Sequence, residues 1–237
     1  MSGLPFAEAM TPDVLSTVVN ETQFGLVSAI RLAVAVMLAG GLAYDRFAPA
    51  RGFALALALG LVASLAWTGH AGSTAGEMAI LHLTADILHL FAAAAWIGGL
   101  VSLVLLLSAV RSDRTLAGAS LARDATQSFS TMGIAIVVVV FATGIVNTCI
   151  LVGSLHRLIV TGYGWLLMLK MALFAIMLVI AAANRFWLTP RLVLARASEL
   201  QTLRQLRRNS MIEIALALLI FAIVGMLGTL HPAIHNL

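Results

Sequence analysis

Six long apolar runs constrain this chain more than any other feature of its sequence. They cover residues 24–44, 52–68, 78–110, 131–152, 165–187 and 211–230. A helix needs about 20 mainly apolar residues to cross a bilayer, and each run is close to that length or longer. The runs are continuous, whereas the strands of an outer-membrane barrel alternate apolar and polar residues over about ten positions. We therefore predict an all-α integral membrane protein with a bundle of about six transmembrane helices.

The composition agrees with this fold class, and the arginines indicate its orientation. The residues are 61% hydrophobic and 10% charged, with a mean hydropathy of +1.04, which excludes an ordinary soluble domain. Most arginines lie in the loops after the first, third and fifth runs, and the alternate loops hold only Arg157. The positive-inside rule makes the arginine-rich loops cytoplasmic and puts both termini on the outer side. The arginines of the cytoplasmic loops therefore account for the pI near 10.2, and no nucleic acid is expected as a partner.

The N-terminal residues are more polar than the six runs and are expected to lie outside the transmembrane domain. Residues 1–23 carry acids but no Lys or Arg, so we expect an external N-terminal segment rather than a signal peptide. Residues 24–237 are expected to form a single transmembrane domain.

The sequence also lacks the features of several other protein classes. The one cysteine, Cys149, excludes an internal disulfide. Motifs of hydrolases and phosphoryl-transfer enzymes (GxSxG, HExxH and the P-loop) do not occur, so no enzyme activity is expected.

The histidines and one acid suggest a metal path on the third apolar run. At 100° per residue, His82, Asp86 and His89 form one stripe of a helix. His82 and His89 are about 10 Å apart along the axis, too far to bind the same ion. His82 with Asp86, or Asp86 with His89, can share an ion, or Asp86 can orient an imidazole from outside the ligand shell. A single buried histidine more often bonds a neighbouring helix, but a carboxylate between two imidazoles at membrane depth favours a function.

Further candidate ligands lie toward the same predicted outer side. Imidazole and thioether groups both suit copper, although methionine is also ordinary filler of apolar cores. The candidates that could assist capture of a metal are His70, His231, His235, Met168 and Met171.

Two cations and two acids at membrane depth require partners. An unpaired cation there costs at least ~2.5 kcal/mol, which applies to Arg31 and Lys170. Asp86 is the expected counter-ion of Lys170, and either cation can alternatively reach the outer interface by snorkelling. Glu213 is expected to pair with Arg185 or Arg208 in a structural role.

The third run also carries a resemblance to a known family. Its sequence from His82 through Asp86 and His89 to Trp96, Gly98 and Gly99 resembles the central motif of the CopD/PcoD family of bacterial copper-resistance and copper-uptake proteins. Further matches are Arg31, Asn184-Arg185 followed by Pro190-Arg191, and Glu213. The resemblance implies a multi-pass bacterial inner-membrane protein with periplasmic termini. It also implies movement of copper from the periplasm toward the cytoplasm, often with a periplasmic copper carrier of the CopC type.

Three functions remain open from the sequence. The leading hypothesis is a copper transporter without its own energy source, in which His82, Asp86 and His89 form the path. The second is a haem b-binding electron-transfer protein, with His82 and either His70 or His231 as axial ligands. The third is a copper-binding assembly factor or sensor that transports nothing.

Overall fold

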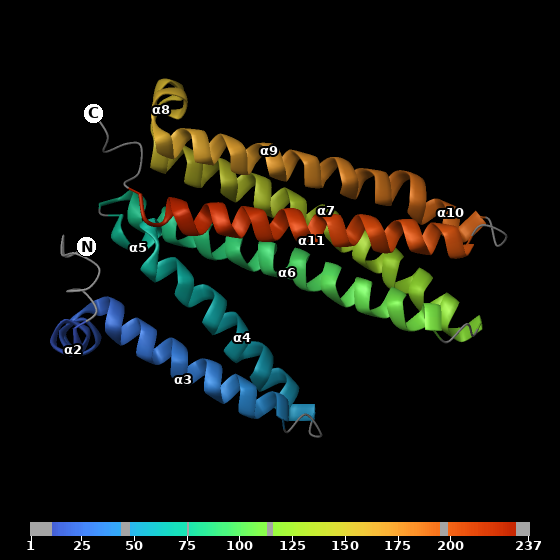
Figure 1. Cartoon of the computed structure of the whole chain (residues 1–237), viewed down its shortest axis with the longest axis horizontal. Helices are drawn as coiled ribbons and strands as arrows, with labels where there is room; N and C mark the ends of the chain where they lie inside the picture. The colour runs from blue at the N-terminus through green and yellow to red at the C-terminus, as the bar shows by residue number, and fades with distance from the viewer. Residues whose placement is uncertain (1–10, 44–47, 75, 113–115, 195–198, 231–237) are drawn as a thin grey trace. The chain divides into compact units, whose positions relative to one another are not determined.

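The computed structural model describes residues 11–43, 48–74, 76–112, 116–194 and 199–230. These residues form helices joined by short turns and contain no strand. In chain order the helices are α2 (Pro12–Glu21), α3 (Gln23–Ala43), α4 (Ala48–Thr68), α5 (His70–Ser73), α6 (Met78–Ser112), α7 (Leu116–Val152), α8 (Leu155–Val160), α9 (Gly162–Ala183), η1 (Asn184–Leu188), α10 (Thr189–Leu194) and α11 (Glu199–Leu227) (Figure 1).

The prediction of six transmembrane helices is confirmed. Among the described residues, six helices are long and apolar enough to cross a membrane: α3, α4, α6, α7, α11 and α9, the last with its continuation through η1. Many of their large apolar side chains are exposed, as expected where lipid covers a helix. α7 and α11 begin well before the predicted runs, because their polar first turns are rich in Ala, Leu, Arg and Gln, which favour helix. The chain is thus a multi-pass membrane protein.

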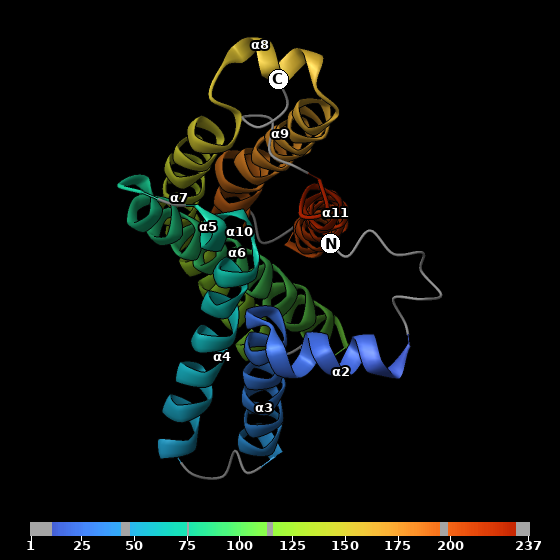
Figure 2. The same cartoon turned by 90° about the vertical axis from the view of Figure 1, so that its left-hand side faces the viewer.

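The first compact unit, residues 1–91, contains α2 to α5 and the first part of α6. The chain leaves α2 at Thr22, whose backbone is extended, and α2 lies across the start of α3 (Figure 2). Gly25 permits this turn because a Cβ there would collide with the backbone of Val18 and Val19. The hydroxyl of Thr22 accepts a hydrogen bond from the Gly25 amide at 3.1 Å. The predicted external segment therefore contains a helix, and its position outside the membrane stays a prediction.

Arg31 joins α3 to α4 inside the first unit. Its Nε donates to the Ser64 hydroxyl at 3.0 Å, and one terminal nitrogen donates to the Ser64 carbonyl oxygen at 2.8 Å and the Thr68 hydroxyl at 3.1 Å. The partners of this cation are therefore neutral oxygens of the neighbouring helix. These bonds explain how a cation can be accommodated beside two apolar helices.

We expect Arg31→Met to lower stability by about 1–3 kcal/mol, because hydrogen bonds from a charged group to α4 are lost. Ser64→Ala is the milder comparison, since Arg31 keeps the Ser64 carbonyl and Thr68 as acceptors. Thermal unfolding of both variants in the same detergent measures the difference. Equal stability of Arg31→Met and the wild type would contradict this role.

The second compact unit, residues 92–237, surrounds its core with four helices. The core packs Trp96 and Leu100 of α6 against Val140 of α7, Met177 of α9 and Ala217 of α11. Trp96 also meets Phe174 edge-on, with ring centroids 5.8 Å apart. The expectation of a single transmembrane domain over residues 24–237 stays a prediction.

Close helix contact in this unit uses one of two adjacent glycines. A Cβ at Gly99 would collide with the ring of Phe129 on α7, whereas a Cβ at Gly98 would meet nothing within 4 Å. The close approach of α6 and α7 therefore depends on the absence of a side chain at Gly99 and not at Gly98.

Candidate functional site: a histidine stripe on α6

His82 is the most buried member of the predicted stripe. Only 1% of its surface is exposed, whereas Asp86 and His89 are half-buried. Its Nδ1 lies 2.7 Å from the hydroxyl oxygen of Thr74. The stripe thus begins at an imidazole that is shielded from solvent and oriented by a second polar side chain.

The corner between α5 and α6 brings Thr74 to His82. Thr74 caps the end of α5, and its amide donates to the Ala71 carbonyl at 3.4 Å. Gly76 then turns the chain with φ 81°, a conformation that side chains other than glycine rarely adopt. The Ala79 amide donates to the Gly76 carbonyl at 3.2 Å as α6 begins. Thr74 and His82 are therefore neighbours because of a local turn that the helical periodicity of the sequence does not reveal.

The Thr74 contact has a chemical consequence for His82. The two ring nitrogens of histidine are distinct, and a partner on one of them selects the tautomer and orients the other. When the Thr74 oxygen accepts from Nδ1–H, a metal would bind His82 through Nε2.

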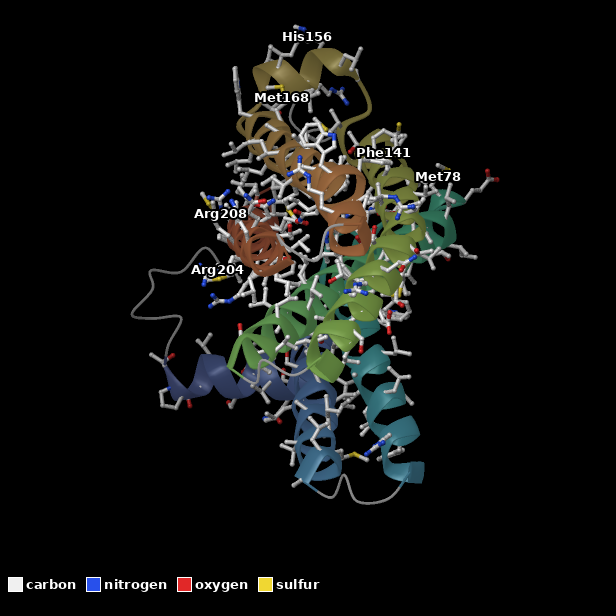
Figure 3. All side chains as sticks on the ribbon, turned by 90° about the vertical axis from the view of Figure 1, so that its right-hand side faces the viewer. Met78, Phe141, His156, Met168, Arg204 and Arg208 are labelled. Atoms are coloured by element: carbon white, nitrogen blue, oxygen red, sulfur yellow. The ribbon has the colours of Figure 1, made fainter. Side chains whose placement is uncertain are left out.

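The other predicted ligands are distributed over both units or lie outside the described residues. His70 is the first residue of α5, in the first unit with the stripe. Met168, half-buried, and Met171, exposed, belong to α9 of the second unit, and the exposed His156 belongs to the short helix α8 (Figure 3). His231 and His235 lie outside the described residues.

The predicted ion pair of Lys170 with Asp86 joins the two units and stays a prediction. Lys170 is half-buried on α9, between Met168 and Met171 in sequence.

Within the described ranges, no three His, Cys, Asp or Glu side chains are close enough together to hold a metal ion. The stripe by itself provides at most two side-chain ligands to one ion, as its spacing along α6 predicts. A complete ligand set would therefore need thioether sulfur, water or a histidine from another segment.

A second polar cluster, which sequence reasoning did not predict, surrounds Glu213 in the second unit. Glu213 is 1% exposed, and its Oε1 accepts a hydrogen bond from Asn184 Nδ2 at 2.8 Å. Its Oε2 accepts from Trp96 Nε1 at 3.4 Å. Asn209 Nδ2 in turn donates to Asn184 Oδ1 at 2.7 Å. The cluster therefore connects α11, η1 and α6 through neutral donors.

The expected pairing of Glu213 with Arg185 or Arg208 is wrong. Arg185 instead donates to the carbonyl and hydroxyl oxygens of Ser130 on α7, the latter at 2.9 Å, and lies over the Phe186 ring. Arg208 is exposed on α11, on the same side as Arg204 (Figure 3). Charge complementarity suggested an arginine, but the structure satisfies the carboxylate with an amide and an indole.

Asn184 and Arg185 start a π-helical turn between α9 and α10. The turn covers Asn184–Leu188 and is capped by the Thr189 hydroxyl, which donates to the Asn184 carbonyl at 2.8 Å. Single π-turns inside helices frequently mark functional positions. The Asn-Arg pair was visible in the sequence, but the π-turn that begins at Asn184 and the hydrogen bond of Asn184 to Glu213 were not.

Two family models match separate parts of the chain. The one described as "Copper resistance protein D" matches residues 123–227, and the one described as "Copper resistance protein D-like, N-terminal domain" matches residues 1–80. No solved structure matches the chain.

Three relatives cover much or nearly all of the chain. It is 32% identical to Copper resistance protein D of Pseudomonas syringae pv. tomato, over 98% of this chain and 74% of the relative. It is 31% identical to Inner membrane protein YebZ of Escherichia coli (strain K12), over 98% of this chain and 77% of the relative. It is 32% identical to Copper transport protein CutJ of Bacillus subtilis (strain 168), over 77% of this chain and 34% of the relative.

Proposed function

The chain belongs to the copper resistance protein D family, and from this premise we propose that it takes copper from the periplasm and conducts it toward the cytoplasm. Its six apolar helices and the names of its relatives agree with a multi-pass protein of the bacterial inner membrane. The relatives with copper in their names are called resistance or transport proteins rather than enzymes, so copper is the cargo of the proposed function and not the cofactor of a reaction.

The observation that carries this proposal is the buried His82 held by Thr74 at the start of the α6 stripe. A shielded, oriented imidazole with a carboxylate one turn further along the helix can accept copper from the outer side. His82 and Asp86 would bind the ion first, and Asp86 and His89 would bind it next. Asp86 is common to both positions, so the ion would move along the helix in steps shorter than the spacing of the two histidines.

Other residues of the chain have proposed supporting roles. His70, His231, His235, Met168 and Met171 would assist capture at the outer side, since both ligand types suit copper. Lys170 would balance the charge of Asp86 when no copper is bound, and Arg31 would hold α3 to α4. A periplasmic carrier of the CopC type would deliver the ion.

The test is copper uptake by the purified chain in proteoliposomes that enclose a copper-sensitive dye. Copper accumulation above that of protein-free vesicles supports transport. Copper retained after desalting without accumulation in vesicles indicates an assembly factor or sensor instead. An absorption spectrum of the same sample decides the remaining alternative, because a Soret band with little copper would indicate a haem protein.

Thr74→Val is expected to weaken copper binding about 10-fold, because the partner that orients His82 is lost while the size of the side chain is kept. The matched control is Thr84→Val, since Thr84 is exposed on α6 two residues after His82. Titration with a competing chelator measures both affinities. Unchanged binding in Thr74→Val would show that the contact of Thr74 with Nδ1 has no part in copper binding.

A further inference from the structure

Among the described residues, the carboxylate of Glu213 has no positively charged partner in the interior of the second unit. The hydrogen bonds to the carboxylate come from an amide and an indole, which are neutral groups. A charge at membrane depth is costly unless it is paired or neutralised, and neutral donors reduce this cost without removing the charge. The arrangement thus calls for a positive species at Glu213.

Space for such a species exists beside the carboxylate. A cavity of about 360 Å³ is lined by Glu213 together with Trp96, Asn184, Arg185 and Ser210, and by mainly apolar side chains elsewhere. A water molecule in the liquid occupies about 30 Å³, so the cavity has room for a small ion with several waters.

Ser210 is an independent sign that something binds in this cavity. It is 1% exposed, and its hydroxyl oxygen has no hydrogen-bond partner among the described residues. It lies one turn before Glu213 on α11, so both side chains are on the same face of the helix. A buried hydroxyl without a partner requires an explanation, and a bound water or ion is the usual one.

The basic residue of the cavity already has other partners. Of the described residues that line it, Glu213 and Arg185 are the ionisable ones. The Arg185 guanidinium is bonded to both oxygens of Ser130 and lies 5.8 Å from the centre of the Phe186 ring. The lining residues contributed by α6, α7, α9, α10 and α11 add no second basic group.

We propose that this cavity binds one exchangeable monovalent cation, which neutralises Glu213. The cation is either a proton on the carboxylate or a sodium ion held by oxygens of Glu213 and Ser210. Hard cations such as sodium prefer carboxylate, hydroxyl and amide oxygens, whereas the imidazoles of the α6 stripe suit copper. The site is therefore chemically distinct from the proposed copper path, and its binding can be measured without copper.

The first arm of the test measures sodium with the purified full chain. Thermal unfolding is recorded as NaCl replaces choline chloride at constant ionic strength, since a ligand of the folded state raises its stability. A sodium-dependent rise in the wild type and in Asp124→Asn that disappears in Glu213→Gln supports a sodium site. Asp124 is the matched control because it is exposed on α7. Ser210→Ala, which keeps the carboxylate, should then require about 10-fold more sodium for the same rise.

The second arm measures the proton by infrared difference spectroscopy of the same variants over a pH series. A carboxylic-acid band that appears and disappears with pH, is absent in Glu213→Gln and persists in Ser210→Ala supports a proton as the cation. The proposal is overturned if sodium has no effect and no Glu213 band changes with pH. Both readouts are independent of copper, so a failure here is distinguishable from a failure of copper uptake.

Discussion

His82→Ala and His89→Ala are each expected to reduce copper binding by at least about 10-fold and to reduce uptake into proteoliposomes correspondingly. Each substitution removes an imidazole from the α6 stripe, and each proposed position has only one other side-chain ligand on that helix, Asp86. Both variants should keep the helical content of the wild type, because α6 is otherwise an apolar helix of strong formers. Chelator competition gives the affinities, and circular dichroism checks the fold.

His156→Ala is the matched control for these variants. His156 is an exposed histidine on α8, away from the stripe in sequence, so its loss should leave binding and uptake unchanged. If His82→Ala and His89→Ala bind and transport copper as His156→Ala does, the stripe is a structural feature and the proposed path is wrong.

Gly164→Ala is expected to cause the largest loss of stability among single methyl additions in the second unit. A Cβ at this buried position would collide with the carbonyl carbon, oxygen and Cα of Leu158, all of them backbone atoms. Backbone cannot rotate away as a side chain can, so α8 would have to move relative to α9. Overpacking typically lowers stability by about 1–3 kcal/mol. Because the colliding atoms of Leu158 belong to the backbone, we expect the loss in Gly164→Ala to be at the upper end of this range. Thermal unfolding in detergent measures the loss.

Gly162→Ala gives the comparison, because Gly162 is in the same first turn of α9 and a Cβ there meets nothing within 4 Å. Its stability should equal or exceed that of the wild type, since alanine favours helix more than glycine does. Similar unfolding temperatures for the two variants would mean that the contact between α8 and α9 adapts more easily than its geometry indicates.

The long helices could be predicted because lipid imposes one simple requirement, an apolar run of sufficient length. The short helices α5 and α8 were not predicted, because local capping determines them. The hydroxyl of Ser154 accepts from the Arg157 amide at 3.4 Å where α8 begins, and Thr161 caps the start of α9. Such bonds depend on single residues in loops and leave no periodic signal in the sequence.

In the candidate site, too, helical periodicity could be predicted from the sequence, whereas contacts made by single residues in turns could not. The stripe of His82, Asp86 and His89 follows from helical periodicity alone. The Thr74 contact required the turn at Gly76, which hydropathy does not reveal. At Glu213, pairing by charge favoured an arginine over the neutral Asn184 that the structure uses.

The π-turn at Asn184–Leu188 also changes the phase of the helix that contains it. Before the turn, α9 contributes Met177 to the core cluster around Trp96. After it, Leu188 and Leu192 pack with Leu206 in a separate cluster. The turn holds about one more residue than an α-helical turn, because its backbone hydrogen bonds join residues five apart instead of four. One continuous rod thus contributes to two separate core clusters and, at the turn that joins its two parts, presents the Asn184 amide to the Glu213 carboxylate.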